Sequence, residues 1–171
     1  MNSMLDTTAA EIEAAVRQLG TAPDTYGPTL NTGVSVEAVE RVGRALADQL
    51  RQHEPTVIAF WSTSDEAVLG HVVARELGAD LVRVNEAEGV VSFSRSIPSG
   101  ARVVLLATAW TKPSRLEALV SMSRAAAAEP AAVASVLGSP RHSVDEVPNV
   151  SLLPQAAVDD KRATGSQGEG A

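Results

Sequence analysis

The chain has 171 residues, 44% of them hydrophobic and only 3% aromatic, which indicates one domain with a core of Ala, Val and Leu. Its net charge of -7 excludes the basic surface expected of a nucleic-acid-binding protein, and the absence of cysteine excludes disulfides and thiolate metal sites. Because no apolar run reaches the roughly 18 residues of a membrane span and the N-terminus does not resemble a secretory signal, we expect a cytoplasmic protein without a membrane partner.

The N-terminal segment is predicted to form one helix followed by a connection. Apolar side chains recur at helical spacing between residues 6 and 19, and Gly20 follows as a stop signal. The residues from there to 34 are rich in Gly, Pro, Thr and Asn, which is typical of an ordered loop. We therefore divide the chain into an N-terminal helix and connecting loop (1–34), an α/β domain (35–154) and a disordered C-terminal tail (155–171) of low apolar content.

Within the domain, apolar runs of strand length alternate with segments of helical periodicity. Ser35 and Thr63 are suitable N-caps, and Thr63 with Glu66 matches a capping box. Pro148 favours an edge position for the last strand. The expected helices cover 35–52, 64–77 and 113–128, and the expected strands cover 56–61, 80–84, 90–95, 102–107, 132–137 and 147–153, with 90–95 antiparallel.

This order predicts an α/β fold: a mostly parallel, doubly wound, Rossmann-like sheet with helices on both faces. The unit from 101 to 138 is its clearest part, because a buried strand, a helix and a second buried strand follow one another. The turn between Ala107 and Arg115 lies at the carboxyl end of a strand and the amino end of a helix. Open α/β sheets bind their ligands at such turns.

The segment from Val103 to Leu116 reads VVLLATAWTKPSRL, an apolar strand, a turn that contains threonine, and the start of a helix. With the element order over 35–153, it resembles the type I phosphoribosyltransferases, most nearly the orotate phosphoribosyltransferase-like group. The matching family motif is of the form VLLVDDVxTTGGTL. The resemblance implies the family's fold and, where the motif is intact, binding of phosphoribosyl pyrophosphate, a ribose 5-phosphate that carries a Mg²⁺-bound pyrophosphate.

The substrate-binding positions of this motif differ from the family pattern. The family's acidic pair, which binds the ribose hydroxyls, aligns with Ala107 and Thr108, so this chain offers no carboxylate there. The glycines of the loop that holds the 5-phosphate align with Pro113 and Ser114, and proline has no N–H to donate. Only Thr111 keeps the family's residue type.

The family's two other pyrophosphate contacts also differ. The turn after the first sheet strand aligns with residues 62–66, STSDE, whose two carboxylates repel pyrophosphate unless a metal bridges them. The basic pair after the next strand aligns with Asn85 and Glu86. Since the charge pattern is lost at three sites, we expect no transferase reaction and assign no catalytic residue.

Four polar residues near the expected helix N-terminus are candidate phosphate ligands: Thr111, Lys112, Ser114 and Arg115. Two cations and two hydroxyls at a helix N-terminus can hold a phosphate or carboxylate. The alternative is that the hydroxyls satisfy free helix amides while Lys112 and Arg115 point into solvent.

A second candidate phosphate site comprises Ser62, Thr63 and Ser64, whose alternative role is to cap the helix that follows. Trp110 can stack on a base or pack in a lid or subunit interface. No metal site is predicted, because the three histidines (His53, His71 and His142) are scattered and the adjacent acids Asp65 and Glu66 suit the first turn of a helix. We therefore expect no cofactor, with Mg²⁺ present only if a phosphorylated ligand binds.

Three functions remain open. The first is a non-catalytic phosphoribosyltransferase-like binding or scaffolding protein that has lost the phosphoribosyl pyrophosphate site. The second is a diverged enzyme, acting on a nucleobase or another phosphorylated metabolite, and the third is a nucleotide-sensing regulator with a protein partner. The resemblance also implies a homo-oligomer, a dimer in the first instance.

Overall fold

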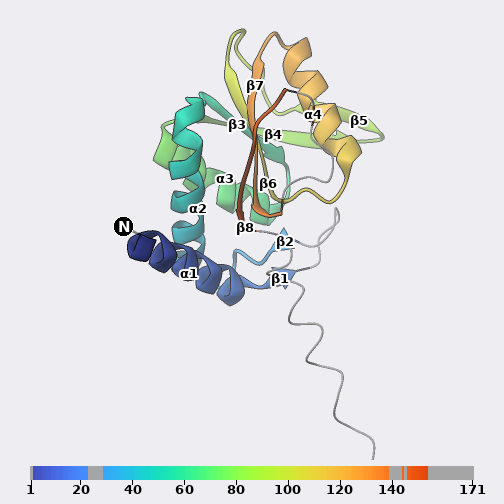
Figure 1. Cartoon of the computed structure of the whole chain (residues 1–171). Coiled ribbons are helices and arrows are strands. Elements are labelled where there is room, and N and C mark those ends of the chain that lie inside the picture. Colours follow the sequence, from blue (N-terminus) through green and yellow to red (C-terminus); the bar gives the residue numbers. More distant parts are fainter. Residues whose placement is uncertain (1, 23–28, 139–143, 145, 154–171) are drawn as a thin grey trace, which may run out of the picture.

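The computed structural model of the chain describes residues 2–22, 29–138, 144 and 146–153 (Figure 1). Its helices are α1 (Asn2–Leu19), α2 (Val36–Leu50), the 3-10 turn η1 (Arg51–His53), α3 (Ser64–Leu77) and α4 (Pro113–Ala125). Its strands are β1 (Thr21–Ala22), β2 (Thr29–Leu30), β3 (Val57–Trp61), β4 (Asp80–Ala87), β5 (Val90–Phe93), β6 (Arg102–Ala109), β7 (Glu129–Leu137) and β8 (Asn149–Leu153). Among these helices, none is long and apolar enough to cross a membrane.

A six-stranded sheet forms the centre of the fold, with the strand order β5-β4-β3-β6-β7-β8. Neighbouring strands are parallel except for the antiparallel pair β4–β5. β3 and β6 run side by side in the middle, where Ile58 pairs with Val104 and Ala59 with Leu105. Both strands are buried on both faces, which explains why their sequences are continuous apolar runs. The mostly parallel α/β fold expected from the sequence is therefore confirmed.

The sheet separates two apolar cores, one beneath each layer of helices. Val104 and Leu106 of β6 face the core that α1, α2 and α3 cover, whereas Val103 and Leu105 face the core under α4. Figure 1 shows α4 on the opposite side of the sheet from α2 and α3. This two-sided covering matches the expectation of helices on both faces.

Helices α2 and α3 pack closely against each other because α2 has a glycine at the contact. An ideal Cβ built on Gly43 would lie 2.4 Å from Cγ1 of Val72. On the outer side of the contact, Arg75 bridges Glu40 and Glu76 with N–O distances of 3.3 and 3.0 Å. A small residue at the interface therefore sets how near the two helices approach.

Several element boundaries differ from the sequence expectation. β4 continues to Ala87, past the predicted end at 84, because β5 pairs with it over the additional residues. β6 continues to Ala109, α4 ends at Ala125 rather than 128, and β7 begins at Glu129 rather than 132. The short β1–β2 pair in the predicted loop was not expected. The predicted tail 155–171 and His142 lie outside the described residues.

Candidate functional site

The carboxyl edge of the sheet, where β3, β4 and β6 end, carries the polar residues that the sequence singled out. Thr63 and Asp65 lie just after β3, Glu86 lies near the end of β4, and Thr108 lies near the end of β6. Residues of β2 also reach this edge, since Thr29 contacts Thr108. Figure 1 shows β1 and β2 at the same end of the sheet as the start of α4.

A buried hydrogen-bond chain occupies the middle of this edge. Both carboxylate oxygens of Glu66 accept the backbone N–H of Thr108 at 2.9 Å, and Oε1 also accepts its hydroxyl at 3.0 Å. The Thr108 hydroxyl lies 2.7 Å from that of Thr29. All three residues are buried. A carboxylate can be buried here because it accepts several hydrogen bonds in place of water.

A second link lies beside this chain. Oδ1 of Asp65 accepts the backbone N–H of Thr32 at 2.8 Å and its hydroxyl at 2.6 Å. Asp65 and Glu66 thus both bind other segments of the chain, one directly to the residues after β2 and the other through β6. The adjacent acids, interpreted from sequence as first-turn helix acids, have tertiary partners that no local pattern indicates.

The predicted phosphate site at residues 62–64 is in part a helix cap. Thr63 is the N-cap of α3, and its hydroxyl accepts the N–H of Glu66 at 3.3 Å. The reciprocal half of the predicted capping box is not formed: the N–H of Thr63 donates to Trp61, and the carboxylate of Glu66 binds Thr108 instead. Ser62 and Ser64 are exposed at this turn.

The four predicted ligands around the start of α4 do not point in one direction. Lys112 is the N-cap residue and makes no side-chain cap hydrogen bond, and Pro113 is the first helical residue as predicted. Thr111, Lys112 and Ser114 are exposed, whereas the side chain of Arg115 is only 15% exposed. The alternative that Arg115 points into solvent is therefore wrong, because most of its side chain is covered.

Arg115 instead connects three elements on the α4 side of the sheet. Its Nη2 lies 3.0 Å from Oε2 of Glu86 at the end of β4, and its Cζ lies 4.4 Å from the ring centre of Trp61 at the end of β3. Stacking on the indole and pairing with a carboxylate hold the guanidinium in place. An anion that bound Arg115 here would have to compete with Glu86.

Trp110 is held by the sheet. Its indole N–H donates to the carbonyl of Ala134 in β7 at 3.1 Å, and its ring packs, half-buried, against the core under α4. Trp110 therefore packs against the core of its own chain, whereas the sequence left open stacking on a base or packing in a lid or a subunit interface.

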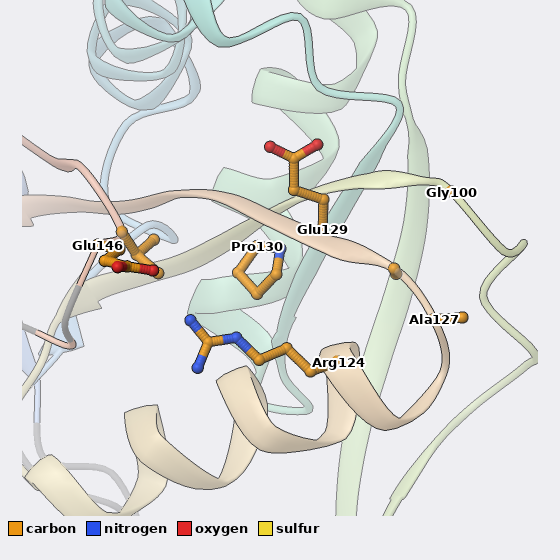
Figure 2. Close-up of a pocket in the computed structure, with 8 residues that line it drawn as sticks. Gly100, Arg124, Ala127, Glu129, Pro130 and Glu146 are labelled. Carbon is orange, nitrogen blue, oxygen red and sulfur yellow. The ribbon is translucent and has the colours of Figure 1, made fainter.

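A shallow pocket lies at the opposite end of the sheet. It has a volume of about 430 Å³ and is lined by residues from the end of α4, the start of β7 and the segments before β6 and β8 (Figure 2). Arg124, Glu129 and Glu146 contribute charge, but Glu129 is paired with Arg102 at 2.7 Å. The sequence did not indicate this pocket, because its lining comes from separate elements. Among the described residues, no three acidic or histidine side chains converge in the manner of a metal site.

No family model and no curated protein matches the sequence. Solved structures do match the fold. Adenine phosphoribosyltransferase from Leishmania donovani is 17% identical with a TM-score of 0.71, covering 94% of this chain and 87% of its own. Adenine phosphoribosyltransferase from Trypanosoma brucei, in complex with AMP, pyrophosphate and ribose-5-phosphate, is 18% identical with a TM-score of 0.68, covering 96% and 87%.

Orotate phosphoribosyltransferase from Mycobacterium tuberculosis H37Rv also matches, at 14% identity and a TM-score of 0.65, covering 89% of this chain and 91% of its own. Both adenine and orotate enzymes are thus similar to this chain over nearly its full length. The element order, the antiparallel pairing of β4 with β5 at one edge of the six-stranded sheet and these similarities agree with the resemblance found in the sequence. The chain has the fold of the type I phosphoribosyltransferases.

Proposed function

We propose that this chain is a non-catalytic binding or scaffolding protein that keeps the phosphoribosyltransferase fold and does not use phosphoribosyl pyrophosphate. The observation that carries the proposal is that three polar side chains at the carboxyl edge are already bonded to other residues of the same chain. Glu66 is bonded to Thr108, Asp65 to Thr32, and Arg115 to Glu86. A substrate would have to displace internal partners of opposite charge or polarity.

The chemistry of the turn after β3 supports this proposal. A pyrophosphate needs N–H donors and cations, which a helix N-terminus normally supplies. The first turn of α3 instead contains the carboxylates of Asp65 and Glu66, and Asp65 accepts two hydrogen bonds from Thr32. The site therefore provides acceptors where an anion needs donors.

The turn before α4 supports it for a different reason. Pro113 provides no N–H, and Thr108, which stands where the family places an acid, is buried inside the protein. A ribose hydroxyl has no carboxylate to bind at this position. Lys112 is an exposed cation at this turn, and it is the residue we would test for any remaining phosphate binding.

The test is calorimetric titration of the whole chain with phosphoribosyl pyrophosphate and Mg²⁺, followed by orotate or adenine while pyrophosphate release is measured. We expect neither saturable heat nor release. Lys112→Ala is the matched variant: any heat that it abolishes comes from the turn before α4. Release at a measurable rate would refute the proposal. Saturable binding without release would instead favour the nucleotide-sensing regulator.

The expected homodimer is a further part of the proposal. β5 is an edge strand whose first residue, Val90, is 66% exposed, and the β4–β5 hairpin presents it to solvent. Light scattering should give twice the chain mass, and Val90→Glu should lower it, whereas Val36→Glu at the start of α2 serves as the control. A wild-type mass of one chain would exclude the dimer, and an unchanged dimer in Val90→Glu would exclude the hairpin as its interface.

A further inference from the structure

The segment from Thr29 to Thr32, which we term the cover, connects two parts of the carboxyl edge. At one end Thr29 reaches Thr108 of β6, and at the other Thr32 reaches Asp65 of α3. Between them, Leu30 is 1% exposed and belongs to the core under α1, α2 and α3. The cover is therefore attached by one polar link on each side of an apolar anchor.

The direction of the first link follows from the number of protons available. A threonine hydroxyl has one proton. The hydroxyl of Thr108 donates to Glu66, so at the 2.7 Å contact it must accept, and Thr29 is the donor. The proton order therefore runs from Thr29 to Thr108 to Glu66. The buried carboxylate fixes how the hydroxyl of the cover must point.

The second link also ends on a carboxylate. Asp65 accepts both the N–H and the hydroxyl of Thr32, so the same side chain fixes the backbone and the side chain of that residue. Hydrogen bonds to a charged acceptor are stronger than those between neutral groups. Two consecutive acids of α3 thus hold both ends of the cover.

Besides these links and the buried Leu30, the cover has few backbone attachments, one of them from the N–H of Asn31 to the carbonyl of Gly20 at 3.0 Å. Among the described residues, β2 has two residues and pairs with the two-residue β1, whereas strands β3 to β8 have between four and nine residues each in a continuous sheet. Segments with few ladder hydrogen bonds open at lower free energy than the core. The cover can therefore separate from the edge while the sheet stays intact.

We propose that Asp65 and Glu66 form a latch that keeps the cover closed over the ends of β6 and α3, and that this edge opens by local release of residues 29–34. The proposal does not depend on the function of the protein, because it concerns only contacts within the chain. Release would break the bonds of Thr29 to Thr108 and of Thr32 to Asp65, and would expose Thr108 and Asp65 to solvent or a binding partner while Glu66 stays bonded to Thr108.

The test is native-state hydrogen exchange of the whole chain by mass spectrometry. Thr29→Val and Thr32→Val each remove one hydroxyl of the cover that takes part in its attachment, and keep the side-chain volume. Each should accelerate exchange of residues 29–34 by about fivefold, the effect of losing one net hydrogen bond, and leave exchange of β7 unchanged. Thr32→Val leaves the N–H link to Asp65 in place, so it keeps the proposal testable if Thr29→Val folds poorly.

The matched control is Thr56→Val. Its hydroxyl also joins the strands β3 and β6, through Arg102, but at their amino ends. It should leave exchange of residues 29–34 unchanged. The proposal is overturned if neither latch variant alters that exchange, or if both raise exchange equally across β6 and β7, which would show that the cover opens only with the whole domain.

Discussion

Glu66 gives the sharpest test of how the carboxyl edge is stabilised. If it were only a first-turn acid that interacts with the helix dipole, Glu66→Ala would cost about 0.3–1 kcal/mol of unfolding free energy. In the structure, however, it accepts the N–H and the hydroxyl of Thr108, and both groups are buried. Each buried donor left without an acceptor costs about 1–3 kcal/mol.

The hydroxyl of Thr108 can turn toward Thr29 when the carboxylate is gone, but its N–H cannot turn. We therefore expect Glu66→Ala to lower the unfolding free energy by about 1–4 kcal/mol, the sum of one unsatisfied N–H and the dipole term, and Glu66→Gln, which keeps one acceptor, by less. Urea unfolding followed by tryptophan fluorescence should show a midpoint lower by about 0.5–2 M, for a slope near 2 kcal/mol/M.

The control for this prediction is Glu37→Ala. Glu37 is also a first-turn acid, in α2, but its side chain is 83% exposed and, within the described part of the chain, pairs with Arg41 on the same helix. Its loss should cost less than about 1 kcal/mol. Equal midpoints for Glu66→Ala and Glu37→Ala would refute the view that the buried bonds to Thr108 stabilise this edge.

Two further predictions concern α2 and α3. Gly43→Ala should lower the unfolding free energy by about 1–2 kcal/mol, because overlap of the new methyl group with Val72 outweighs the gain of about 1 kcal/mol in helix propensity. The same change in a Val72→Ala background should be neutral or stabilising. Equal effects in both backgrounds would contradict the contact. The hydrogen bond from Arg75 lowers the pKa of Glu76, so NMR titration of Arg75→Gln should show a higher midpoint for that carboxyl. Because the folded-state pKa is the lower one, the pair's contribution to stability is present above the unfolded pKa and is lost as pH falls through the folded value; an unchanged midpoint would contradict the pairing.

Several helix ends were predictable from the sequence, because each depends on a few adjacent residues. Ser35 and Thr63 were recognisable as N-caps, and both side chains accept the expected backbone N–H. Gly78 follows the predicted helix 64–77 and ends α3 with a left-handed conformation. These features involve residues within about one helical turn, so they are determined by residues that are close in sequence.

Strand boundaries were less predictable, because a strand ends where its partner stops pairing. The sequence of residues 85–87, NEA, does not have a strand pattern, yet it extends β4 through pairing with β5. The start of β7 at Glu129 likewise follows its pairing with Arg102 of β6. Such limits depend on which strands are neighbours.

The sequence by itself determined the α/β class, the order of the central elements and the loss of the family's charge pattern, because periodicity and residue type are local properties. Only the tertiary structure decided what replaced that pattern. Glu66 meets Thr108 across 42 positions and Thr29 meets Thr108 across 79. The spacing of these residues in the sequence does not predict their contacts. They meet because β3 lies beside β6 and because β2 lies across the edge of the sheet.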